Sequence, residues 1–129
     1  MYLISKTVIN FHLCINKIMI YTIIYLNIMW DFLSFFLIVN NLPNYHTILW
    51  KNTNDKNNYA SKQLFAYLIL FWGIIRLYGI YYNLNDLLKI TYAFEGFIFL
   101  YETLITKNIK LVEGLFISLL CFVIYLLII

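Results

Sequence analysis

Residues 64–82, which read LFAYLILFWGIIRLYGIYY, decide the fold of this chain. At a rise of about 1.5 Å per residue, a helix of this length crosses about 30 Å, the thickness of the hydrocarbon core of a bilayer. Three tyrosines, Tyr78, Tyr81 and Tyr82, end the stretch in the way that aromatic residues mark a membrane interface. The stretch therefore predicts a membrane-spanning helix that carries one charged residue, Arg76.

The composition indicates the same class of protein. Of the 129 residues, 64% are hydrophobic and only 12% are charged, whereas soluble domains carry about a quarter of charged residues. A soluble fold of this size could not bury so much apolar surface. The net charge of +3 comes from lysines scattered between apolar stretches, so we expect no nucleic-acid partner, which would need a basic face.

Three more apolar stretches accompany the first, and the connections between the last three are short. Short connections force neighbouring helices to be antiparallel. The sequence therefore predicts an all-α, integral membrane four-helix bundle with antiparallel up-down spans. The expected spans are residues 19–39, 64–82, 87–105 and 111–129.

Two segments lie outside these spans. Residues 40–63 form a polar loop, whose apolar stretch 45–50 we expect at the membrane surface. Residues 1–18 mix apolar and polar side chains, which predicts an interfacial segment that is irregular or a short amphipathic helix. We expect residues 19–129, which include this loop and the four spans, to form a single membrane domain.

Charged side chains inside the expected spans are the candidate functional residues. A charge at membrane depth costs about 3 kcal/mol or more, so it needs a partner. Folding the chain at the 83–86 turn brings Glu95 to nearly the depth of Arg76, and Asp31 can join this pair from the first span. Glu102 shares a helix face with Glu95 but lies nearer the opposite interface, within reach of a lysine.

Two interpretations of these charges remain open. One is polar glue that fixes helix pairing and partner recognition. The other is a proton or substrate relay, with Asp31 or Glu95 as the titrating group, which makes the chain a small proton-coupled transporter or channel subunit. A relay usually contains histidine, and the expected spans contain none. The four glycines, Gly73, Gly79, Gly96 and Gly114, are predicted points of close helix approach.

The sequence contains none of the short motifs that mark catalytic, metal or nucleotide sites. Its two cysteines, Cys14 and Cys121, are far apart and form no metal-binding or redox motif. We therefore expect no enzyme activity, no catalytic residue, no metal and no cofactor.

Two stretches, residues 61–82 and 92–116, follow a recognisable pattern. The first begins with Ser-x-x-x-Phe and ends with Ile-Arg-x-Tyr-Gly, and the second contains Phe-x-x-Glu followed by a basic turn and a glycine. Over about residues 45–125 the chain resembles the ergosterol biosynthetic protein 28 family. The matching residues are Ser61, Phe65, Ile75, Arg76, Tyr78, Gly79, Phe99, Glu102, Lys110 and Gly114. The family's Arg, Trp and His are replaced by Gln63, Leu68 and Ile98.

The resemblance implies a non-enzymatic, multi-pass scaffold in the membrane of the endoplasmic reticulum. Family members tether the enzymes of sterol C-4 demethylation: the sterol C-4 methyl oxidase, the C-3 sterol dehydrogenase/decarboxylase and the 3-keto reductase. Tethering raises the effective concentration of a poorly soluble intermediate. By this resemblance the matched residues are structural and partner-binding positions. The further partners to be tested are the bilayer and a second copy of the chain.

Overall fold

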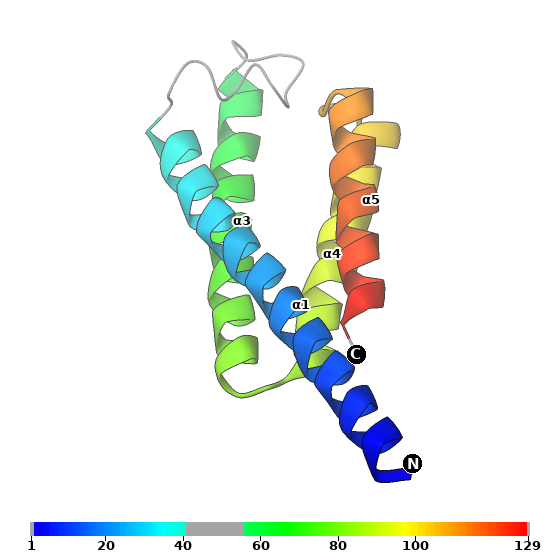
Figure 1. Ribbon diagram of the computed structural model, residues 1–129. Coiled ribbons are helices and arrows are strands. Elements are labelled where there is room, and N and C mark those ends of the chain that lie inside the picture. Colours follow the sequence, from blue (N-terminus) through cyan, green and yellow to red (C-terminus); the bar gives the residue numbers. More distant parts are fainter. Residues whose placement is uncertain (1, 41–55, 129) are drawn as a thin grey trace.

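The computed structural model describes residues 2–40 and 56–128, and over these residues the fold is all-α (Figure 1). The described residues contain four helices: α1 (Tyr2–Val39), α3 (Lys56–Tyr81), α4 (Asn85–Leu104) and α5 (Leu111–Leu127). The prediction of an all-α protein with four helices is confirmed. Residues 41–55 of the expected polar loop, including the apolar stretch 45–50, lie outside the described residues, whereas residues 56–63, also assigned to that loop, belong to α3.

Helix α1 is longer than the span expected at 19–39. It runs for 38 residues and includes residues 2–18, which the sequence assigned to a separate interfacial segment. The polar side chains that suggested a break, such as Lys6, Asn10 and His12, are all exposed. The helix contains no glycine or proline, so nothing interrupts its hydrogen-bond ladder. In Figure 1 its first turns extend beyond the other helices, at the end of the molecule where the C-terminus also lies.

The turn between α3 and α4 has a defined geometry. Asn83 has a left-handed φ of 56°, a conformation that asparagine tolerates better than most residues. The amide of Leu84 donates to the Gly79 carbonyl at 2.8 Å and the amide of Asn83 donates to the Ile80 carbonyl at 3.2 Å. This is the Schellman arrangement that ends a helix. It reverses the chain within three residues, so α3 and α4 become neighbours.

The helices form two pairs, α1 with α3 and α4 with α5, and the contact of α3 with α4 joins the pairs (Figure 1). In the view of Figure 1 the two pairs diverge with distance from the α3–α4 turn. Each pair closes around a glycine. A Cβ on Gly73 would lie 3.3 Å from the Cβ of Asp31 on α1, and one on Gly96 would lie 3.0 Å from the Phe122 ring on α5. Glycine therefore permits the closest approach within each pair.

The buried core has two apolar clusters. One lies towards the α3–α4 turn and includes Ile28, Ile80 and Leu88. The other lies towards the opposite end and includes Phe65 and Trp72. Polar and charged side chains are buried as well as the two apolar clusters, among them Asp31, Arg76, Thr91 and Glu95.

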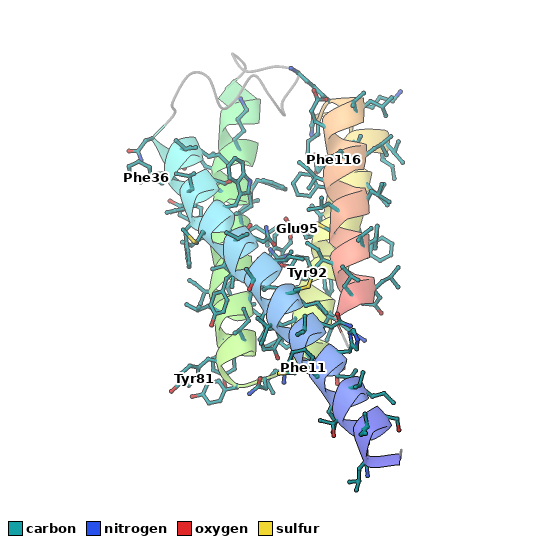
Figure 2. The ribbon with its side chains drawn as sticks, viewed as in Figure 1. Phe11, Phe36, Tyr81, Tyr92, Glu95 and Phe116 are labelled. Carbon is teal, nitrogen blue, oxygen red and sulfur yellow. The ribbon has the colours of Figure 1, made fainter. Side chains whose placement is uncertain are left out.

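Large apolar side chains are exposed on all four described helices. Figure 2 shows Phe11, Phe36 and Tyr81 pointing away from the helices, whereas Tyr92 and Glu95 lie between them. Exposed positions on each helix carry large hydrophobic side chains, among them Leu26, Phe71, Phe97 and Leu126. Two helical stretches, Leu3–Val39 and Lys62–Tyr81, are long and apolar enough to cross a membrane. Leu111–Leu127 is apolar but shorter, and α4 carries four charged residues.

Candidate functional site

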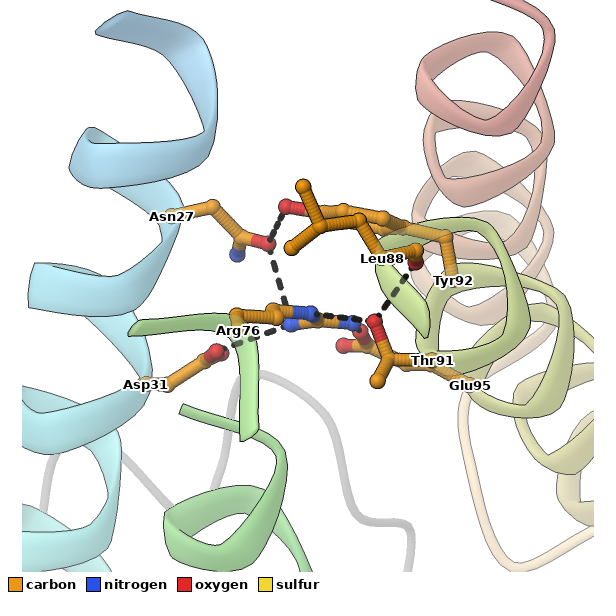
Figure 3. A network of polar contacts seen from close by, with 7 residues as sticks. All are labelled: Asn27, Asp31, Arg76, Leu88, Thr91, Tyr92 and Glu95. Atoms are coloured by element: carbon orange, nitrogen blue, oxygen red, sulfur yellow. Dashed lines mark hydrogen bonds and ion pairs between the residues drawn. The ribbon is translucent and has the colours of Figure 1, made fainter. Parts of the chain in front are cut away.

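The candidate site is built around Arg76 on α3, whose side chain is completely buried. Its guanidinium donates to acceptors from two other helices, as Figure 3 shows. Nη1 donates to Asp31 Oδ2 at 2.8 Å and to Asn27 Oδ1 at 3.0 Å, both on α1. Nη2 pairs with Glu95 Oε2 and Nε donates to Thr91 Oγ1 at 3.2 Å, both on α4. One side chain thus connects three of the four helices.

Helical spacing explains why these acceptors converge. Asn27 and Asp31 are four residues apart on α1, and Thr91 and Glu95 are four apart on α4. Residues with this spacing lie on one helix face, one turn apart. Each neighbouring helix therefore presents one neutral and one acidic acceptor to the planar fork of donors on Arg76. Thr91 Oγ1 is held in place because it donates in turn to the Leu88 carbonyl at 2.7 Å.

The ring of Tyr92 covers one face of the Arg76 guanidinium. The Cζ atom of Arg76 lies 3.9 Å from the centroid of the Tyr92 ring, and Trp72 lies at 5.9 Å. A guanidinium over an aromatic face at this distance makes a cation–π contact. The Tyr92 hydroxyl also donates to Asn27 Oδ1 at 2.7 Å, so this ring bridges α4 to α1. The positive charge is therefore enclosed by hydrogen bonds in its plane and by a ring on its face.

The charges of this network do not balance. When both carboxylates are ionised, Asp31 and Glu95 contribute two negative charges against the single positive charge of Arg76. Asp31 is 2% and Glu95 is 6% exposed, so solvent screens neither of them well. A buried excess charge is expensive, and it is neutralised by a proton or by a cation from outside.

A cleft of about 450 Å³ lies beside the network. Asp31 and Trp30 of α1 line it, as do Glu95 of α4 and Phe116 and Cys121 of α5. Trp30 is 55% and Phe116 is 64% exposed, so the cleft opens outward between α1 and α5. It therefore gives access from the surface to the two carboxylates that contact Arg76.

Glu102 has a different role from the other charges. Its carboxylate was expected within reach of a lysine, which stays a prediction. The carboxylate accepts hydrogen bonds from Thr106 Oγ1 and Asn108 Nδ2, each at 2.9 Å. Its backbone carbonyl accepts from the amides of Asn108 and Ile109 at 3.0 and 3.3 Å. Glu102 therefore organises the turn that leads from α4 into α5.

Of five more residues that the resemblance singled out, four lie in the helix contacts: Phe65, Gly79, Phe99 and Gly114. The ring of Phe65 on α3 meets Phe99 on α4 edge to face, with centroids 5.3 Å apart. A Cβ on Gly79 would lie 2.8 Å from Leu88, and one on Gly114 would collide with Thr103 Oγ1. These glycines permit close contact at both turns of α4. Tyr78 is the exception, because it is 53% exposed and faces outward.

Sequence reasoning did not identify Thr91 and Tyr92 as members of the network. A signal for both exists, because they precede Glu95 by four and three residues and so share its helix face. Cys121, for which the sequence predicted no metal-binding or redox role, lies on the wall of the cleft. The cleft itself had no signal in the sequence.

The part of the chain that the structure describes contains no group of three or more histidine, cysteine, aspartate or glutamate residues arranged to hold a metal ion. The sequence matches no protein-family model, no curated protein and no solved structure.

Proposed function

We propose that this chain is an integral membrane protein that holds partner proteins together within the bilayer and has no catalytic activity of its own. The proposed partners are the enzymes of sterol C-4 demethylation, and the proposed location is the endoplasmic reticulum membrane. The observation that carries the proposal is the enclosure of Arg76: the buried charges bind helices to one another, while the outward faces stay apolar.

Membrane insertion of all four helices is supported by how polar groups are distributed. A polar group at membrane depth must be satisfied within the protein. Arg76 is paired with both Asp31 and Glu95, and Ser118 Oγ donates to the Gly96 carbonyl at 2.9 Å. The charges of α4, which lower its hydropathy, are placed in this network or towards the helix ends. The exposed large hydrophobic side chains then face lipid or partner helices.

The identity of the partners is supported by the resemblance. The residues that match the ergosterol biosynthetic protein 28 family include Arg76 in the network, Glu102 in the α4–α5 turn and the Phe65–Phe99 contact. These side chains shape the bundle itself. A scaffold needs such fixed geometry, because it must present the same outward faces to each partner.

The experiment that tests the proposal is affinity capture of the tagged chain from gently solubilised membranes of a sterol-producing eukaryotic cell. We expect mass spectrometry to find C-4 demethylation enzymes. Glu102→Ala should lower their recovery because it disrupts the α4–α5 turn, whereas Asp86→Ala, at an exposed acid in the first turn of α4, should not. Recovery of the chain without any sterol-modifying enzyme would refute the proposed partnership.

One observation favours a second candidate, a small proton-coupled transporter or channel subunit. The cleft reaches Asp31 and Glu95, so a titrating carboxylate within it is accessible from the surface. The test is reconstitution in liposomes that enclose a pH-sensitive dye. Protein-dependent proton flux that is lost in Glu95→Gln would favour transport, and liposomes that respond no faster than protein-free ones would exclude it.

A further inference from the structure

The cleft beside Arg76 has the dimensions of a small-molecule site. Its volume of about 450 Å³ falls within the range of about 300–1,000 Å³ that ligand pockets occupy. Residues of all four described helices line it, and the network holds three of these helices, α1, α3 and α4, in register. Neither partner binding nor transport is needed for this site to exist, and it therefore stands apart from the proposed function.

The charged residues that line the cleft are all acidic. Three carboxylates line the cleft, those of Asp31, Glu95 and Glu113. None of the described residues that line it is lysine, arginine or histidine. Arg76 contacts two of these carboxylates from outside the lining, and it leaves one negative charge in excess within the network. A cation in the cleft would remove that excess, and its attraction is strong because Asp31 and Glu95 are shielded from water.

The walls of the cleft are mainly apolar and aromatic. Trp30, Tyr92, Phe99 and Phe116 contribute rings from three helices. Aromatic faces favour organic cations, particularly where water is excluded. The small, strongly hydrated metal ions prefer oxygen cages, whereas these rings suit a charge attached to an apolar body.

We propose that this cleft binds a lipophilic organic monocation, a protonated amine carried on an apolar body. The ammonium group lies against Asp31 and Glu95, and the apolar body lies between Trp30 and Phe116, where the cleft opens outward. A lipid acyl chain or a helix of a second copy could fill the same volume, but neither provides the positive charge that the carboxylates lack.

A matched pair of fluorinated probes tests this proposal. The full-length protein is placed in nanodiscs of zwitterionic phosphatidylcholine. Binding of 4-(4-fluorophenyl)butylamine and of its neutral counterpart 4-(4-fluorophenyl)butan-1-ol is then followed by ¹⁹F NMR. Protein-free nanodiscs correct for partition into lipid. We expect saturable binding of the amine at an affinity at least about tenfold above that of the alcohol.

Variants separate the roles of charge and volume. Glu95→Gln leaves one acid for one base, so we expect it to weaken amine binding by about tenfold or more and to leave the alcohol unchanged. Leu120→Trp fills the outer part of the cleft without altering the network and should weaken amine binding. Leu126→Trp, on the same helix but at a 75% exposed position outside the lining, should not.

Two results would overturn the proposal. Equal affinities for amine and alcohol would make the cleft a groove for neutral lipid. Amine binding that persists unchanged in Leu120→Trp would place the amine elsewhere, and this variant keeps the test decisive even if Glu95→Gln fails to fold. Loss of sterol enzymes from affinity capture would leave both results unaffected, so the two proposals fail independently.

Discussion

Arg76→Gln should be one of the most destabilising single substitutions in this chain. The substitution removes the guanidinium from between Asp31 and Glu95 and leaves both carboxylates buried without their cation. Breaking a buried ion pair by removing one partner costs about 3–5 kcal/mol. At the lower end this is already more than a hundredfold change in the folding equilibrium, since about 1.4 kcal/mol corresponds to a factor of ten.

The same geometry predicts an unequal response when an acid is removed instead. Glu95→Gln leaves Arg76 paired with Asp31 at 2.8 Å and removes the excess negative charge. The loss of one charged hydrogen bond, about 1.5–3 kcal/mol, is therefore offset in part. We expect Glu95→Gln to cost less than half as much as Arg76→Gln. The triple variant Asp31→Asn, Arg76→Gln, Glu95→Gln has no buried charge left in the network and should recover most of the stability lost in Arg76→Gln.

The assay is reversible unfolding in mixed micelles with increasing sodium dodecyl sulfate, in which circular dichroism reports the helical content. Free energies of unfolding are compared among the wild-type protein, the two single variants and the triple variant. The reasoning is refuted if Arg76→Gln and Glu95→Gln are equally destabilised. It is also refuted if the triple variant is less stable than Arg76→Gln, because the cost would then come from lost packing and not from unpaired charge.

Gly114→Ala should destabilise the protein by about 1–3 kcal/mol, since its new methyl group would collide with the Thr103 hydroxyl; adding Thr103→Ala should restore part of the melting temperature, because Ile109 and the Cβ at position 103 still lie 3.0 Å away, and no recovery would contradict the contact. Phe65→Ala should cost about 3–5 kcal/mol because it empties a buried ring position, whereas Tyr78→Ala, at an outward-facing ring, should change the free energy of unfolding in micelles by about 0.5 kcal/mol or less; similar losses for the two would contradict their assigned places. Glu102→Ala should accelerate amide hydrogen exchange in the α4–α5 turn without changing exchange in α1, because its hydrogen bonds are local; uniform acceleration would show that the residue supports the whole fold.

Much of the helical architecture could be predicted because apolar runs and turns mark it directly. The partnership of Arg76 with Glu95 was also foreseeable, since the 83–86 turn places them at similar depth. Helix α1 was underestimated because polar side chains suggested a break at residues 1–18. Polarity alone does not end a helix, and no glycine or proline is present there to do so.

The role of Glu102 and the cleft could not be predicted, for a common reason. Both depend on geometry beyond the periodicity of a single helix. The hydrogen bonds of Glu102 require the turn at Thr106 and Asn108, where Lys107 adopts a left-handed φ of 56°. The cleft requires the divergence of the two helix pairs, which no residue pattern specifies.

The order in which the network residues occur along the chain has a consequence for biosynthesis. Asp31 precedes Arg76 by 45 residues, and Glu95 follows it by 19. A chain made from its N-terminus therefore has Asp31 available when α3 emerges, so the nascent α1–α3 hairpin is electrically neutral at this depth. Arg76 has a partner before α4 exists, and Glu95 then enters a site that already contains a cation. In the proposed membrane-inserted state, this chain order means that Arg76 never enters the bilayer as an isolated charge.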